Sequence, residues 1–238
     1  MAGFEIFNDA GYKIAGNDYP NLVLYGKGQL TTTDFNINGP GFDGRSYIGS
    51  AVVPDDGGTV RFYRSISGHH MVEQGGRIFS ESRGALFEYY SFGPVVADES
   101  SGGFELYRED GQLMFCTARP FLRLAGVYVD TRKPDNPEVM NASGYAFTAK
   151  TAFAQGTRKF AFQFSNAHLQ YRLYRFADRP YSVSYEYVRA AALMADGTFK
   201  CRYLNRYNWT HSIERRRVWE VANGDAPQRM LIADVTGL

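Results

Sequence analysis

The 238-residue sequence has few of the features by which many protein classes are recognised. It contains two cysteines, four histidines and a formal net charge of +1. Two cysteines are too few for a disulfide-rich scaffold, and a nearly neutral chain creates no overall field that attracts nucleic acid or anionic membranes. We therefore expect no nucleic-acid partner. Cys116 and Cys201 fit a reducing cytosol as buried free thiols, and a disulfide that forms late, outside a reducing cell, is the alternative.

Long apolar runs are also missing. No uncharged apolar stretch approaches the roughly 18 residues that a membrane-spanning helix requires. The first residues, MAGFEIFNDAGYK, lack the basic region followed by an apolar region that marks a secretory signal. The sequence thus predicts a protein made in a cytoplasm, with no membrane span.

Motifs of known catalytic chemistry are absent from the sequence. No phosphate-binding loop, dinucleotide fingerprint or nucleophile elbow occurs, and residues 38–44 (NGPGFDG) have the composition of a loop. Asp55 and Asp56 lie in PDDGG, where turn formation explains them. We expect no catalytic residues, no cofactor and no enzymatic activity.

The histidines do not predict a metal site within one chain. His69 and His70 are adjacent, and neighbouring residues of a strand point to opposite faces, which places them poorly for one ion. An axial metal held by one histidine from each chain of a symmetric oligomer remains an alternative. The expected metal ligands within the chain are therefore none.

Aromatic residues and glycines are abundant instead. The chain has 17 Tyr, 18 Phe and 25 Gly, and apolar and polar residues alternate in residues 60–66, 160–165 and 181–187. This period of two, with Asp-Gly, Asn-Gly and Gly-Gly turns, is typical of antiparallel strands half covered by a core. Only residues 189–195 (RAAALMA) have a helical composition. The sequence predicts an all-β fold of the sandwich or barrel type.

An internal repeat is the most informative feature of the sequence. Residues 3–26 (GFEIFNDAGYKIAGNDYPNLVLYG) align without gaps to residues 103–126 (GFELYREDGQLMFCTARPFLRLAG), with eight identities. Both segments read as a hairpin, with Gly11 and Gly111 in the tight turn, followed by a short apolar strand. A second, weaker match relates residues 87–98 to residues 185–196.

The repeat predicts a duplication and a division of the chain. We expect two tandem antiparallel β-sandwich-like domains, residues 1–99 and residues 100–200, joined at the polar stretch 98–103 (DESSGG). Residues 201–238 are expected to form a C-terminal extension that packs on the second domain. Its last segment, RMLIADVTGL, alternates like a strand that returns to a sheet.

Tyrosine and arginine interleave in residues 171–176 (YRLYRF) and 202–207 (RYLNRY), and a basic run (ERRR) occupies residues 214–217. Tyr, Trp and Arg are enriched at protein interfaces, because they bury much area at modest entropic cost. Two alternatives remain: a sugar-stacking platform, or core tyrosines beside solvated arginines. The predicted interface residues are Tyr171, Arg172, Tyr174, Arg175, Arg202, Tyr203, Arg206, Tyr207, Trp209, Arg215, Arg217 and Trp219.

The repeated hairpin and the closing segment 232–237 (IADVTG) resemble those of small distal-tail virion proteins of tailed bacteriophages. These proteins belong to the tail tip, baseplate or fibre region, and their functions are largely unknown. The resemblance implies a location in the virion tail and a structural role there. The expected partners are other tail proteins and further copies of this chain, for which a trimer is plausible; a host surface receptor is a partner in the alternative reading. The family offers no catalytic residues to carry over.

The expected function is therefore that of a non-enzymatic structural or assembly protein of a phage tail. A receptor-binding module that recognises a host-cell glycan or pilus is the alternative from a different class. A tail-associated glycan depolymerase is a third reading, for which the sequence offers no pair of carboxylates.

Overall fold

The computed structural model describes residues 5–7, 13–16, 21–34, 48–96, 103–130, 146–151, 153, 156–164, 169–175, 182–194, 196–211, 219–222 and 228–238. The regular elements in these ranges are all β-strands, and their pairings are antiparallel. The predicted all-β class is therefore confirmed. No helix in the described ranges is long and apolar enough to cross a bilayer.

One sheet has six strands in the order β12-β19-β14-β6-β9-β3. Their bounds are β3 (Leu22–Thr31), β6 (Val60–Ser65), β9 (Leu86–Pro94), β12 (Leu124–Asp130), β14 (Phe160–Phe164) and β19 (Gln228–Asp234). The predicted return of the C-terminal segment to a sheet is confirmed, because β19 pairs with β12 on one side and β14 on the other.

The other large sheet runs in the order β13-β17-β16-β7-β8-β5-β4, and it also includes β15, which pairs with β16 and β18. The bounds are β4 (Thr33–Asp34), β5 (Gly49–Val52), β7 (Met71–Gln74), β8 (Arg77–Ser80), β13 (Ala146–Lys150), β15 (Leu169–Arg175), β16 (Ser182–Leu193), β17 (Thr198–His211) and β18 (Trp219–Ala222). The predicted helical composition of residues 189–195 is misleading, because residues 189–193 end β16. Ala190, Ala191 and Ala192 are buried there, where sheet packing overrides local propensity.

The main core lies between these two sheets. It joins Phe162 and Met230 of the six-stranded sheet to Met71, Leu193 and Phe199 of the other sheet, all of them buried. The Phe162 and Phe199 rings meet edge to face, with 6.4 Å between their centroids. Each sheet thus supplies one apolar face to a shared interior.

A second core covers the opposite face of the six-stranded sheet. There Phe62 and Phe92 are buried together with Val235 from the C-terminal end of the chain. The alternation in residues 60–66 predicted Phe62 and Tyr63 on opposite faces, one apolar and one polar, but both side chains are buried. The polar face is missing because cores lie against both sides of this sheet.

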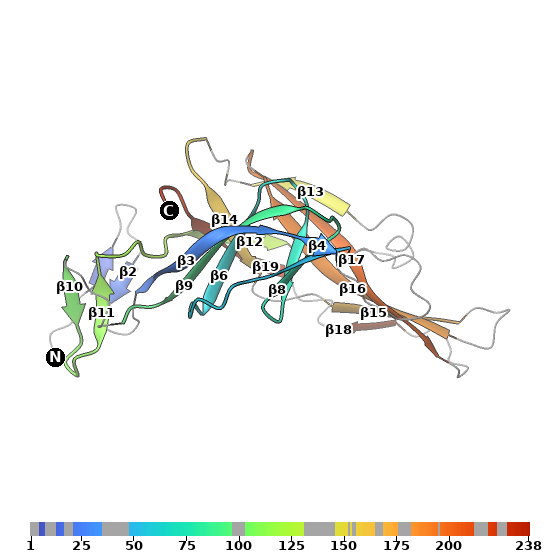
Figure 1. The fold of residues 1–238 in the computed structure, drawn as a ribbon, viewed down its shortest axis with the longest axis horizontal. Coiled ribbons are helices and arrows are strands. Elements are labelled where there is room, and N and C mark those ends of the chain that lie inside the picture. The colour runs from blue at the N-terminus through green and yellow to red at the C-terminus, as the bar shows by residue number, and fades with distance from the viewer. Residues whose placement is uncertain are drawn as a thin grey trace.

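Two small hairpins lie side by side at one end of the molecule (Figure 1). They are formed by β1 (Glu5–Phe7) with β2 (Lys13–Gly16), and by β10 (Glu105–Tyr107) with β11 (Leu113–Cys116). The prediction of a hairpin in each copy of the repeat is confirmed. Cys116 on β11 and Cys201 on β17 are both buried and are not joined in a disulfide.

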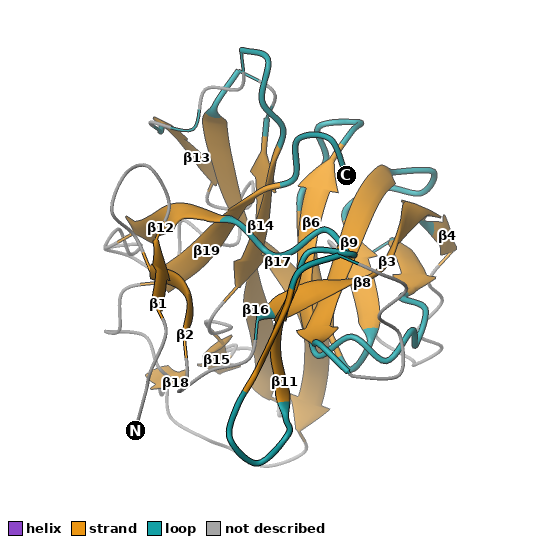
Figure 2. Cartoon of the chain, turned by 90° about the vertical axis from the view of Figure 1, so that its left-hand side faces the viewer, coloured by secondary structure: helices purple, strands orange, loops and turns teal. Residues whose placement is uncertain are grey.

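Each of the two large sheets contains strands from both sides of the predicted boundary at residues 99–100. β6 meets β14 in one sheet, at Tyr63 and Phe162, and β7 meets β16 in the other, at Met71 and Ala191. Strands from both sides of the predicted boundary therefore stand edge to edge, and both contribute residues to the main core. Figure 2 shows β6, β14 and β16 from the hairpin end of the molecule.

Candidate functional site

The strands that carry most of the predicted interface residues form a four-stranded extension of one sheet. On the side of β16 away from β17, Ala191 pairs with β7, whereas residues 182–188 pair with β15. β15 pairs in turn with β18. We call β15, β18, residues 182–189 of β16 and residues 202–211 of β17 the arm. In Figure 1 the arm lies at the end of the molecule opposite the two hairpins.

The length of β16 and β17 creates the arm. These strands have 12 and 14 residues. By contrast, β7, which adjoins β16, and β8, which adjoins β7, have four residues each. Buried residues of both strands, such as Leu193 and Phe199, fix the inner end of this long hairpin in the main core. The remainder of the hairpin continues beyond the core, where β15 and β18 pair alongside it.

The backbone register brings most predicted interface residues together within the arm. β15 supplies Tyr171, Arg172, Tyr174 and Arg175, β17 supplies Tyr203, Arg206, Tyr207 and Trp209, and β18 begins at Trp219. Arg202 lies at the base of the arm and is half-buried, opposite Ala146 and Ala190. Arg215 and Arg217 lie outside the described residues.

Two rows of directly paired residues cross the arm. In one, Arg172 stands between Tyr185 and Trp219. In the next, Tyr171 stands between Glu186 and Glu220. Tyr185, Glu186 and Glu220 are not among the predicted interface residues. The tyrosine periodicity of residues 181–187 indicated the strand that holds Tyr185 and Glu186, but no sequence pattern pointed to Glu220.

A register shift occurs within the arm. Glu186 pairs with Tyr207 and Tyr187 pairs with Asn205, so Arg206 is an additional residue on β17. Such bulges locally bend a strand and change which residues share a face. The interleaved pattern of residues 202–207 therefore does not follow one continuous alternation along β17.

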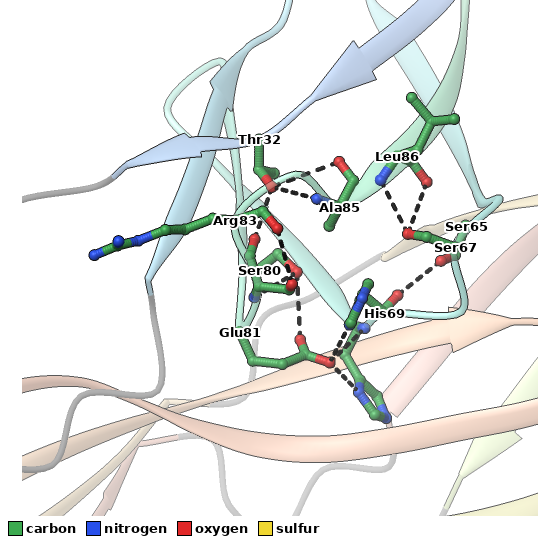
Figure 3. Close-up of polar contacts among 11 residues, drawn as sticks. Thr32, Ser65, Ser67, His69, Ser80, Glu81, Arg83, Ala85 and Leu86 are labelled. Carbon is green, nitrogen blue, oxygen red and sulfur yellow. Dashed lines mark hydrogen bonds and ion pairs between the residues drawn. The ribbon is translucent and has the colours of Figure 1, made fainter.

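The two adjacent histidines belong to a different polar cluster, which Figure 3 shows. His69 and His70 precede β7 and are not in a strand, so the expected separation onto opposite faces is wrong. Both rings approach one carboxylate: the Nδ1 atoms of His70 and His69 lie 2.8 Å and 3.6 Å from Oε1 of Glu81. The backbone N–H of His70 also donates to this oxygen, at 3.0 Å.

Neighbouring hydroxyl groups complete this cluster. The Ser65 hydroxyl donates to the carbonyl oxygen of His69 at 2.8 Å, and the Leu86 backbone N–H donates to the Ser67 hydroxyl at 2.9 Å. In the part of the chain that the structure describes, no three His, Cys, Asp or Glu side chains are grouped as metal ligands. These contacts fasten the loop after β6 to the segment between β8 and β9.

The hydrogen bonds from His70 lower the pKa of Glu81. Burial by itself raises the pKa, but hydrogen bonds from the His70 ring and backbone outweigh burial and lower the pKa from 4.5 to about 2. Because the folded-state pKa is depressed, the ionised carboxylate stabilises the fold fully above pH 4.5. That contribution is lost as the pH falls through about 2.

Glu81→Gln is expected to destabilise the protein by about 1–2 kcal/mol at pH 7. Urea denaturation of the full chain at pH 7 and at the lowest pH where it folds measures the effect, and the difference from wild type should shrink at low pH. Glu109→Gln, in the exposed turn between β10 and β11, controls for loss of one negative charge. An equal pH dependence in both variants would contradict the assigned role of Glu81.

The fold and the arm define an all-β protein with two large antiparallel sheets, one of which carries a four-stranded extension. No protein-family model, curated protein or solved structure matches this chain.

Proposed function

We propose that the protein is a non-enzymatic structural and assembly protein of a phage tail, in the tip or baseplate region. In this proposal it forms a homo-oligomer and docks onto neighbouring virion proteins through the arm. The observation that carries the proposal is an extended strand group, rich in Tyr, Trp and Arg, that has no counterpart among the described strands before residue 99. The sequence resemblance to distal-tail proteins supports the location.

We also propose that the chain arose by duplication of one β unit. The hairpins support this with identical pairing at residue numbers 100 apart: Glu5 with Gly16, and Glu105 with Cys116. Both hairpins also have a register shift at the same step, before Phe7 in the first and before Tyr107 in the second. Shared irregularities of this kind are a stronger sign of common origin than shared regular strands.

The following strand supports the duplication in the same way. β3 has a register shift between Leu24 and Gly26, and β12 has one between Leu124 and Gly126. A Cβ atom on Gly26 would lie 2.1 Å from Asp56 Oδ2, and one on Gly126 would lie 2.9 Å from Phe153 Cζ. Gly26 therefore leaves room for Asp56, which precedes β6, and Gly126 leaves room for Phe153, which precedes β14.

Strand order supports the duplication across the whole sandwich. From the junction outward, β6-β9-β3 corresponds to β14-β19-β12, and β7-β8-β5 corresponds to β16-β17-β13. The second sequence match does not fit this scheme, because residues 87–98 include β9 and residues 185–196 include β16, which lie in different sheets. The proposal therefore depends on the first match and on the topology.

The arm stands out within this scheme. β15 and β18 correspond to no strand described in the first half, and the β16–β17 hairpin is much longer than the corresponding β7–β8 hairpin. Strands that lengthen one copy beyond the shared core do not serve the fold that both copies have in common. Tyr, Trp and Arg in such strands provide large contact areas with polar groups at their tips.

The receptor-binding alternative is favoured by the two hairpins at the other end. Phe7, Phe104 and Tyr107 on or beside these hairpins are 52 %, 56 % and 48 % exposed. Exposed aromatic side chains are typical of recognition surfaces. In this alternative the hairpins contact a host glycan or pilus.

Infectious titre separates these functions. A phage lacking the gene is complemented with the double variant Tyr171→Ala and Arg172→Ala, whose positions form the centre of the arm, or with Lys27→Ala on exposed β3 as a control. We expect the arm variant to lower the titre by roughly 100-fold, as a loss of a few kcal/mol at a docking hot spot implies. Thermal unfolding of the purified variant and control is measured alongside, so that a loss of docking is distinguished from a loss of folded protein. Electron microscopy should show particles with incomplete tails.

Two results would contradict this function. An unchanged titre with the arm variant would exclude docking through the arm. Complete particles that fail to adsorb, together with purified protein that protects cells from infection, would favour the receptor-binding alternative.

A further inference from the structure

The strand β12 forms an edge of the six-stranded sheet that is unusually apolar. In the described part of the chain, β12 pairs with β19 alone among the strands. Leu124, Val127 and Val129 are 57 %, 52 % and 49 % exposed, and no charged residue occurs between Arg123 and Asp130. Edge strands that expose apolar side chains and carry no lysine invite pairing with another strand.

The corresponding edge at the other end of the sheet is protected. On β3, the exposed positions that align with Val127 and Val129 are Lys27 and Gln29. The start of β3 is also covered, because the Leu24 backbone N–H donates to the Pro120 carbonyl oxygen at 2.8 Å. A lysine on an edge strand is a common device against unwanted pairing, and β12 has none.

The core holds β12 in a fixed position. Tyr128 pairs with Met230 and packs against Phe199, with 4.8 Å between the ring centroids. Val127 pairs with Leu231, which itself packs against the second core on the outer face. The edge is therefore ordered before any partner arrives, and this lowers the entropic cost of pairing.

We propose that β12 pairs antiparallel with β12 of a second copy of this chain across a two-fold axis. This places the exposed valines of one copy against those of the other, where β-branched cross-strand pairs are favourable. The result is one continuous sheet through both copies. The proposal deepens the proposed assembly function, since it names the surface through which the chain forms an oligomer.

The chain itself provides the reason for choosing a second copy as the partner. Inside the sandwich, the corresponding strands β6 and β14 already meet antiparallel at Tyr63 and Phe162, and β7 and β16 meet antiparallel at Met71 and Ala191. Edge-to-edge antiparallel pairing is thus how two such units join within one sheet. The junction between two copies of β12 would repeat that arrangement at the outer end of the same sheet.

Sedimentation of the full-length protein tests this inference. Wild type is expected to sediment as a dimer at tens of micromolar. Val127→Lys and Val129→Lys, which introduce the kind of charge that β3 carries, should each weaken dimerisation by roughly 100-fold. Gln29→Lys on β3 is the matched control and should remain dimeric. Thermal unfolding of dilute, monomeric protein should be unchanged in all three variants, because the substituted side chains are exposed. At tens of micromolar, the two β12 variants should unfold at a lower temperature than wild type, because dimerisation stabilises the folded chain.

Hydrogen exchange locates the junction. Amides of residues 124–130 should become more protected in the dimer than in the Val127→Lys monomer. A wild-type monomer, a Val127→Lys variant that dimerises like wild type, or new protection confined to the arm would overturn the inference. A wild-type monomer would leave docking through the arm intact, since that function is tested separately by infectious titre.

Discussion

Phe162→Ala is expected to destabilise the protein by about 3–5 kcal/mol, because it removes a buried aromatic side chain and leaves a cavity. Phe162 is fully buried in the main core. Its ring meets the rings of Phe164 and Phe199 edge to face, at centroid distances of 5.3 Å and 6.4 Å. It also stands at the junction of the two halves, paired with Tyr63 on β6.

Urea denaturation of the full chain measures this loss. Phe7→Ala, in an exposed position on β1, is the matched control and should cost less than about 1 kcal/mol. If both substitutions had the same small effect, the two sheets would not share the core described above. A large loss with a single transition would agree with one cooperative unit.

Gly49→Ala is expected to destabilise the protein by about 3 kcal/mol through overpacking. A Cβ atom at this position would lie 2.1 Å from the backbone oxygen of Ser82 and 2.9 Å from Oγ1 of Thr32. Neither atom moves away readily. The Thr32 hydroxyl donates to the same Ser82 oxygen at 2.7 Å and accepts a hydrogen bond from the Ala85 backbone N–H at 2.9 Å.

The control for this substitution is Gly84→Ala. Gly84 has a φ of 69°, and no atom lies within 4 Å of an added Cβ, so only the left-handed conformation resists substitution. That cost is about 1–2 kcal/mol. If thermal unfolding showed Gly49→Ala to be the milder substitution, the close approach between β5 and the segment after β8 would be wrong.

Local features of the fold could be predicted from the sequence. Hairpin turns and alternation depend on neighbouring residues, so the repeated hairpins at residues 3–26 and 103–126 were visible without a structure. The register shift shared by β3 and β12 follows the same alignment, since it falls at Gly26 and Gly126. The all-β class rests on many such local signals that agree with one another.

Long-range pairing could not be predicted in this way. Nothing in residues 60–66 or 160–165 indicates that β6 and β14 lie side by side, because alternation does not identify the neighbouring strand. Burial on both faces of β6 also hides Tyr63, which alternation assigned to a polar face. Two sheets shared by both halves were therefore found only in the structure.

The neighbours of the candidate site residues could not be predicted from the sequence either. The Tyr and Arg pattern selected strands that the backbone places together in the arm, although their cross-strand neighbours Glu186 and Glu220 carry no comparable pattern. The histidine pair was misjudged because the sequence does not show that His69 and His70 precede β7. Whether two adjacent side chains diverge or converge depends on that boundary.

Under the proposed tail function, an electron cryo-microscopy map of the virion tests the central claim most directly. The account predicts density for the sandwich in the distal tail, with β15 and β18 of the arm against a different virion protein. A particle without this chain, or one in which the arm faces solvent while the hairpins make all the contacts, would contradict it.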